Sequence, residues 1–184
     1  MNNIVLIGFM AVGKTTVGKS LSYLMHYQFV DTDMYIKKKE GKKIATIFKE
    51  DGEPYFRELE RNVSKGLLKN PRKVISTGGG LFMDDISRGL YLKEDFVVFL
   101  KLPMDTIYKR LMKNNKRPLA QSVTKEELTK RYQQRLPIYK NAHLEVDTTG
   151  KTAFEIAKEI KKAYYDWLTK GEQNGKRRNT KKSN

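Results

Sequence analysis

A glycine-rich segment near the start of the chain has the residue types that hold a nucleoside triphosphate. Residues 8–16 read GFMAVGKTT, the pattern G-x-x-x-x-G-K-[ST], between an apolar run and a helical pattern. Backbone N–H groups of such a turn face phosphate oxygens, and the dipole of the following helix favours the phosphate charge. Lys14 is placed for the β- and γ-phosphates, and the Thr15 hydroxyl is placed for Mg²⁺. An ordinary glycine-rich turn is the alternative. The context favours a phosphate site and leaves the phosphate acceptor open.

Two acidic residues, Asp31 and Asp33, follow the short apolar run 28–30. In an extended strand end, residues two apart point to the same side. One carboxylate could hold a water of the Mg²⁺ shell, and the other could accept a proton from a hydroxyl that attacks the γ-phosphorus. The alternative is that one of them caps the helix beginning here. The two roles are compatible, and we favour catalysis or binding for Asp33.

An arginine and three glycines could bind the acceptor. Arg57 lies one helical turn before Glu60, which can orient its guanidinium for bidentate binding of a carboxylate or phosphate. A surface salt bridge is the alternative for Arg57 alone. Gly78-Gly79-Gly80 is more specific, because without side chains its backbone N–H groups can approach a ligand closely.

Further arginines follow in the second half of the chain. The polar, basic stretch 112–123 suits a lid that brings Arg117 to the phosphates of ATP, although it could also be an ordinary mobile loop. Arg131 and Arg135 lie one turn apart on the next helical segment. Helix geometry alone does not show which of them faces the site.

Length and composition exclude several classes of protein. A chain of 184 residues fits one α/β domain, and the lack of cysteine rules out disulfides, thiolate zinc sites and cysteine nucleophiles. No segment has the apolar length of a membrane span or the pattern of a signal peptide, so we expect a soluble cytoplasmic protein. His26 and His143 are expected at surface or packing positions.

The net charge of +16 raises the question of nucleic-acid binding. The polar tail 170–184 holds six basic residues and one acidic residue, and it is expected to be disordered. The other basic residues are spread along helices, where they solvate the surface and attract anionic substrates. We therefore expect no nucleic-acid partner beyond weak contacts of the tail.

These candidates must be positioned by an alternation of strands and helices. Strand-like runs lie at 4–7, 28–31, 73–76, 96–100 and 143–147. Helical patterns lie at 14–25, 33–40, 44–50, 53–68, 103–112, 125–141 and 152–168. The alternation predicts an α/β fold with a parallel sheet and right-handed connections. Ligands of such sheets bind at the carboxyl ends of the strands, where the phosphate loop, the Asp pair and the glycine triplet all fall.

Taken together, these motifs give the chain a resemblance to the shikimate kinase family. The motifs are GxxxxGKTT at 8–16, DTD at 31–33, GExxFRxxE at 52–60, GGG at 78–80, RPL at 117–119 and RxPxY at 135–139. The resemblance covers about residues 2–168. It implies a three-layer P-loop fold with a central five-stranded parallel sheet flanked by helices. It also implies a domain over 1–169, with 33–61 binding the substrate and about 112–123 forming the lid.

The resemblance further implies an activity and a role for individual residues. The reaction is transfer of phosphate from ATP to the 3-hydroxyl of shikimate, in a monomer, with Mg²⁺ as cofactor. Asp33 would bind shikimate and act as base, Arg57 and Arg135 would clamp its carboxylate, and Gly79 would add a backbone contact. Thr15 would bind Mg²⁺ directly and Asp31 through water. The residues expected at ATP are Ala11, Val12, Gly13, Lys14, Thr15, Thr16 and Arg117.

The chain departs from the family in the phosphate loop, where relatives commonly have glycine or another small residue at positions 11 and 12. Ala11 and Val12 are bulkier. One alternative function is a kinase of the same fold that acts on gluconate or a nucleoside monophosphate. A less favoured one is a P-loop protein that binds nucleic acid through its tail.

Overall fold

A five-stranded parallel sheet forms the centre of the molecule, with strand order β2-β3-β1-β4-β5. The computed structural model describes residues 2–113 and 124–180, with side chains through Lys170. The strands are β1 (Ile4–Ile7), β2 (Gln28–Asp31), β3 (Lys73–Ser76), β4 (Phe96–Lys101) and β5 (Leu144–Asp147). The predicted fold class is confirmed.

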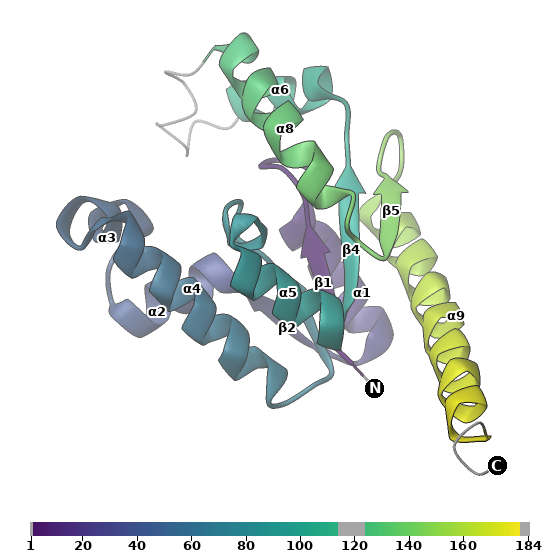
Figure 1. The fold of residues 1–184 in the computed structure, drawn as a ribbon. Coiled ribbons are helices and arrows are strands. Elements are labelled where there is room, and N and C mark those ends of the chain that lie inside the picture. Colours follow the sequence, from purple (N-terminus) through teal and green to yellow (C-terminus); the bar gives the residue numbers. More distant parts are fainter. Residues whose placement is uncertain (1, 114–123, 181–184) are drawn as a thin grey trace.

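Helices cover both faces of this sheet (Figure 1). They are α1 (Lys14–Met25), α2 (Thr32–Glu40), α3 (Ile44–Glu50), α4 (Gly52–Leu68), the 3₁₀ turn η1 (Leu81–Met83), α5 (Asp85–Glu94), α6 (Met104–Met112), α8 (Lys125–Tyr139) and α9 (Ala153–Thr180). On one face α1 packs against α9 and β3, and α9 also contacts β4 and β5. On the other face α5 packs against β4 and α4.

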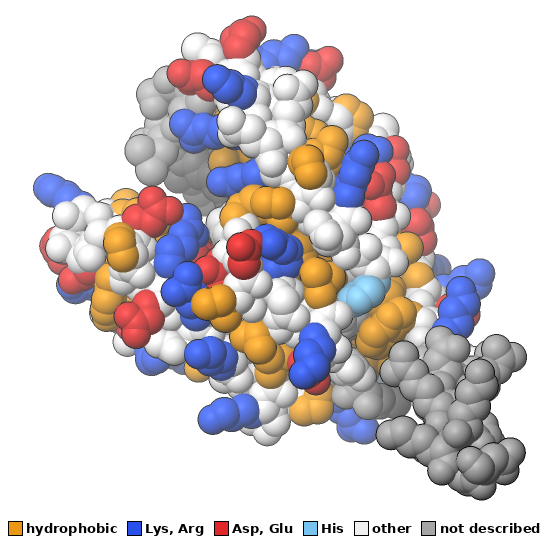
Figure 2. All heavy atoms as spheres, in the orientation of Figure 1, with side chains coloured by type: hydrophobic (Ala, Val, Ile, Leu, Met, Phe, Trp, Pro, Cys, Tyr) orange, Lys and Arg blue, Asp and Glu red, His pale blue; other side chains and the backbone are white. Residues whose placement is uncertain are grey.

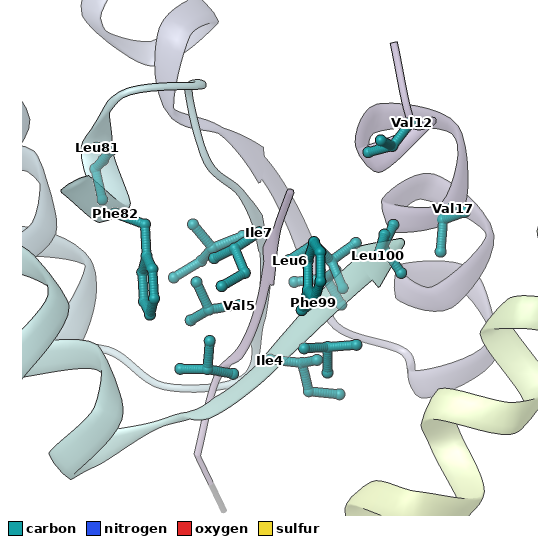
Figure 3. Packing of buried hydrophobic residues seen from close by; sticks show 14 of the residues in the cluster. Ile4, Val5, Leu6, Ile7, Val12, Val17, Leu81, Phe82, Phe99 and Leu100 are labelled. Carbon is teal, nitrogen blue, oxygen red and sulfur yellow. The ribbon is translucent and has the colours of Figure 1, made fainter. Parts of the chain in front are cut away.

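The central strands are apolar throughout because both of their faces are covered. Every residue of β1 is buried, and so are the first five of β4. Figure 3 shows Leu81 and Phe82 on one face of β1, with Val12 and Val17 on the other. The phosphate loop therefore starts from the most deeply buried part of the fold, which fixes where it begins.

The carboxyl ends of the strands meet at one edge, where the arrowheads of β4 and β5 point in Figure 1. The β2–β3 pairing ends with Asp31 opposite Ser76, so the acidic pair and the glycine triplet leave the sheet side by side. Next to them, Thr77 donates to the Leu6 carbonyl of β1 from both its backbone N–H and its hydroxyl, each at 3.1 Å. The loops after β1, β2 and β3 are thus joined at a single edge.

Most predicted element bounds differ from the observed ones by one or two residues, and the sequence pattern does not predict η1 and α5. Two further differences matter. The helix α2 already begins at Thr32, so Asp33 is in its first turn rather than on an extended strand end. The last helix continues to Thr180, whereas the sequence predicts a disordered tail from Lys170. Lys, Arg, Glu and Gln favour helices, and extending an existing helix avoids the cost of nucleation. Residues 181–184 lie outside the described residues.

The surface gives no concentrated basic patch on the face drawn in Figure 2. Lysine and arginine side chains are interleaved there with acidic and hydrophobic ones. Among the described helices, none is long and apolar enough to cross a membrane.

Candidate active site

The loop between β1 and α1 forms the floor of a pocket of about 470 Å³. The pocket is lined by Met10, Ala11, Gly13, Lys14, Thr15, Thr16, Asp31, Asp33, Ser76, Thr77, Gly79 and Arg110. It therefore brings together the predicted phosphate loop, both predicted aspartates and one glycine of the triplet. Val12 is not part of this lining but faces a second, neighbouring pocket.

Backbone geometry explains the two glycines of the phosphate loop. Gly13, the N-cap of α1, has φ 104° and makes no side-chain cap, so no N-cap side chain stands between the start of α1 and a ligand. A Cβ on Gly8 would lie 2.6 Å from the Leu100 carbonyl oxygen, closer than atoms can pack. Lys14 Nζ donates to the carbonyls of Gly8 at 2.8 Å and Phe9 at 3.0 Å, which holds the ammonium group beside the loop.

The two bulky loop residues are accommodated differently. Val12 is buried at 2% exposure within the hydrophobic core, so its extra volume fills the interior beneath the loop. Ala11 has φ 60°, in the left-handed region where a side chain is unfavourable. The larger side chain of Val12 is thus accommodated in the hydrophobic core, whereas alanine at position 11 strains the local backbone.

The two aspartates reach the same pocket from different elements. Asp31 ends β2, and its Oδ1 accepts the N–H of Met34 at 3.2 Å, so it caps α2. Its Oδ2 accepts the Thr15 hydroxyl at 3.0 Å. Asp33 follows two residues later, in the first turn of α2, and also lines the pocket. The predicted convergence is correct, but the reason is the strand-to-helix junction rather than the alternation of a strand.

Each glycine of the triplet makes room for a different functional side chain. A Cβ on Gly78 would overlap the Asp33 carboxylate, and one on Gly80 would overlap the Arg57 guanidinium. A Cβ on Gly79 would lie 3.7 Å from Arg135 Nη1, which already donates to the Gly79 carbonyl at 2.7 Å. The loop is the meeting point of the three side chains predicted to bind the acceptor.

Arg57 is held by two carboxylates of its own helix. Its Nη1 donates to Glu60 Oε2 at 2.6 Å, and its Nη2 donates to Glu53 Oε1 at 2.7 Å. Partial burial acts to lower the pKa of Arg57, but the hydrogen bonds to Glu60 and Glu53 outweigh it, so the pKa is raised. Burial raises the pKa of Glu60 to about 7, against the opposing effect of Arg57. The guanidinium is therefore charged and fixed in orientation.

Of the two arginines on α8, Arg135 lies at the site. Besides the Gly79 contact, its guanidinium carbon lies 5.8 Å from the centre of the Phe9 ring, next to the phosphate loop. Arg131 is exposed. Helix α8 thus carries an acceptor-side arginine directly above the glycine triplet.

Arg110 is a site residue that the motif analysis did not identify. Its Nη1 donates to the carbonyls of Ala11 at 3.2 Å and Val12 at 3.3 Å, and the residue borders both pockets. The strand order of the sheet explains its position. The strand before α6 pairs directly with β1, so α6 starts beside the phosphate loop.

The second pocket, of about 230 Å³, adjoins the first through Gly13, Thr16 and Arg110. Its remaining lining comes from Val12, Val17, Thr148, Lys151, Ala153 and Ile156. Four of these six residues have apolar side chains, whereas Thr148 and Lys151 are polar. The two pockets therefore lie next to each other along the phosphate loop, the first reaching Gly79 and the second reaching the start of α9.

Arg117 and residues 114–123 of the expected lid lie outside the described residues. His26 is the C-cap of α1. His143 accepts the Val97 N–H at 3.0 Å through Nδ1 and stacks on Phe96, which is a packing role.

The oxygen ligands at the loop suit Mg²⁺, a hard cation that keeps several waters. The Thr15 hydroxyl and the Asp31 carboxylate are already in contact, and both line the phosphate pocket. Within the described ranges, no cluster of three or more His, Cys, Asp or Glu side chains could hold a metal by itself. A metal at this loop would therefore depend on phosphate oxygens and water for its other ligands.

Comparison with known proteins places the chain among kinases. The family model for shikimate kinase matches residues 10–165. The shikimate kinase of Persephonella marina is 39% identical over 160 residues, covering 87% of this chain and 97% of the relative. That of Thermodesulfovibrio yellowstonii is 42% identical over 166 residues, covering 89% and 95%. The solved structure of the Acinetobacter baumannii shikimate kinase in complex with shikimate has a TM-score of 0.83 at 32% identity, covering 90% and 94%.

Proposed function

This chain belongs to the shikimate kinase family, and we propose that it transfers the γ-phosphoryl group of ATP to the 3-hydroxyl of shikimate. The products are shikimate 3-phosphate and ADP. One observation carries the proposal: the glycine triplet gathers Asp33, Arg57 and Arg135 beside the phosphate loop. A small hydroxylated acid needs such a combination, because its carboxylate requires cations and its reacting hydroxyl requires a base.

On the acceptor side, Arg57 and Arg135 bind the carboxylate of shikimate. Both come from rigid helices, and Arg57 is oriented by two carboxylates before the substrate arrives. Gly79 adds a backbone contact from the pocket wall. The acceptor hydroxyl then faces Asp33, which accepts its proton as the hydroxyl oxygen attacks the γ-phosphorus. The bond from the γ-phosphorus to the bridging oxygen of ADP breaks in the same step.

On the phosphate side, the loop N–H groups and Lys14 bind the β- and γ-phosphates of ATP. Lys14 already lies at the loop on the Gly8 and Phe9 carbonyls, so a rotation of its side chain reaches the phosphates. Mg²⁺, held by Thr15 and through water by Asp31, neutralises charge on the phosphate oxygens when it is bound. Arg117, carried by the lid, is proposed to add a further cation at the γ-phosphate.

We assign the second pocket to the nucleoside of ATP. It continues from the loop on the side away from the glycine triplet, as the chain of phosphates requires. Its apolar side chains suit a planar base, and the Arg110 guanidinium at its rim can stack on one. We further propose a cytoplasmic monomer, because ATP is a cytoplasmic metabolite and one chain supplies both halves of the site.

An acceptor panel tests this function. The purified protein is given ATP and Mg²⁺ with shikimate, gluconate or one of several nucleoside monophosphates, and ADP is measured by a coupled assay. We expect shikimate alone to raise ADP formation above the rate with ATP only, and mass and ³¹P NMR spectra to place the phosphate on the 3-oxygen. Asp33→Asn should abolish turnover. A preference for gluconate or a nucleotide would refute the proposed acceptor and favour another kinase of this fold.

A further inference from the structure

Thr32, between the two site aspartates, is fully buried and hydrogen-bonded to the glycine triplet. Its side chain is 0% exposed. Its hydroxyl oxygen accepts the backbone N–H of Gly78 at 2.8 Å, across 46 residues of sequence and away from solvent. None of the roles expected from the sequence motifs falls on this threonine.

This hydrogen bond continues the sheet beyond its last strand pair. The β2–β3 pairing ends where Asp31 faces Ser76. After that point α2 begins, and its backbone N–H and carbonyl groups turn along the helix axis. The Thr32 hydroxyl replaces the missing ladder partner, so it ties the first turn of α2 to the glycine triplet.

Gly78, which Thr32 holds, also contacts Asp33, the proposed base. Gly78 lies so close to Asp33 that an added Cβ would overlap the Asp33 carboxylate. The contact therefore depends on how Gly78 is placed relative to α2. The same loop continues into Gly79 and Gly80, beside Arg135 and Arg57.

We propose that Thr32 is a positioning residue of the phosphoryl transfer, which fixes the glycine triplet against the helix that carries Asp33. The inference rests on the proposed function. A valine of the same shape would leave the buried Gly78 N–H without this acceptor, and such a loss is costly. The Asp33 carboxylate lies against Gly78 and is an acceptor at hand. In the variant the amide turns toward the base and draws it from the acceptor hydroxyl.

The test compares Thr32→Val with Thr32→Ser, which keeps the hydroxyl. Ser87→Ala is the control, because it removes a fully buried hydroxyl from α5, outside the site. We expect Thr32→Val to lower kcat with shikimate by about tenfold or more, with the KM for ATP within about twofold. Thr32→Ser and Ser87→Ala should stay within about threefold of the unmodified enzyme. Amide exchange of Gly78, followed by NMR, should accelerate in Thr32→Val and not in Thr32→Ser.

Two results would overturn the proposal: an unchanged kcat in Thr32→Val, or an equal loss in Thr32→Ser, which would assign the effect to packing of the methyl group. If Thr32→Val does not fold, Thr32→Ala replaces it in the same comparison. Failure of the proposed function appears separately, as an unmodified enzyme that does not use shikimate. The kcat values of the variants are then measured with the acceptor that the enzyme does use, and the amide exchange rate of Gly78 is measured in either case.

Discussion

Arg57 of the acceptor site forms an ion pair with the buried Glu60, with Nη1 and Oε2 2.6 Å apart. The Glu60 side chain is 1% exposed, whereas that of Glu53, the other partner of Arg57, is 62% exposed. Glu60 thus binds the guanidinium from the protein interior, and Glu53 binds it from the solvent side. Among the described residues, none hydrogen-bonds the remaining oxygen of Glu60. The pair therefore places an incompletely hydrogen-bonded, buried carboxyl group beneath the substrate arginine.

This buried carboxyl group makes the stability of the protein depend on pH. Burial raises the pKa of Glu60 to about 7 from its ordinary 4.5, so the folded state holds a proton that the unfolded chain releases between these values. Stability from this group is complete below about pH 4.5 and is lost as the pH rises through about 7. Relative to Glu60→Gln, the unmodified protein should lose about 2 kcal/mol of unfolding free energy between roughly pH 5.5 and pH 8.

Urea unfolding of both proteins at the two pH values measures this difference, since other titrating groups are common to both and cancel. Parallel changes in the two proteins would mean that Glu60 is ionised throughout and that Arg57 outweighs its burial.

The planar fork of Arg57 should matter more than its charge. Arg57→Lys keeps the charge but cannot contact two carboxylates and a substrate together. We expect the KM for shikimate to rise by roughly tenfold to a hundredfold and the KM for ATP to change by less than about threefold. Steady-state kinetics with each substrate varied gives the comparison. Arg61→Lys is the matched control, because Arg61 lies one turn further along α4 and pairs with Asp84 instead. Equal rises in both KM values would contradict the assignment of Arg57 to the acceptor site.

The sequence predicts the parts of this site that depend on local pattern. Apolar runs place the strands, and strand ends place the phosphate loop, Asp31 and the glycine triplet at one edge. The convergence of Asp33 with Asp31 is correctly predicted for a wrong reason, because a helix rather than a strand carries Asp33. Local pattern cannot show whether Arg131 or Arg135 faces the site, since the two lie one turn apart on the same side of the helix. Only the packing of α8 shows that it is Arg135.

Contacts between distant segments could not be predicted from the sequence. Arg110 reaches the phosphate loop across 98 residues, and Thr32 reaches Gly78 across 46. Each depends on strand order, which places neighbours in space that no spacing in the chain reveals. The helical continuation of α9 past Lys170 is missed for another reason. A polar segment without an apolar face is typical of disorder, and only its attachment to a packed helix changes that expectation.

The glycine triplet offers a test in which a single methyl group is added. In Gly80→Ala the Cβ would overlap the Arg57 guanidinium, which must move, so the KM for shikimate should rise by about tenfold with little change for ATP. Gly89→Ala on α5 is the matched control, because a Cβ there meets nothing within 4 Å. That variant should keep its kinetics and gain about 0.5–1 kcal/mol in thermal unfolding, since alanine favours a helix interior. An unchanged KM for shikimate in Gly80→Ala would show that the Arg57 guanidinium can move away from the added methyl group without losing its contact with shikimate.

The strain at Ala11 should be measurable as a stability difference. An alanine at φ 60° costs about 1–2 kcal/mol, whereas glycine adopts this conformation freely but loses about 0.4–1 kcal/mol through its more flexible unfolded chain. Ala11→Gly should therefore be neutral or stabilising by about 1 kcal/mol in urea or thermal unfolding. Ala163→Gly, inside α9, should instead destabilise by about 1 kcal/mol. The KM for ATP should stay within about twofold in Ala11→Gly, because the carbonyl that accepts from Arg110 is retained. If both variants lose the same stability, the left-handed conformation of Ala11 carries no strain, and alanine at this position stabilises the protein relative to glycine.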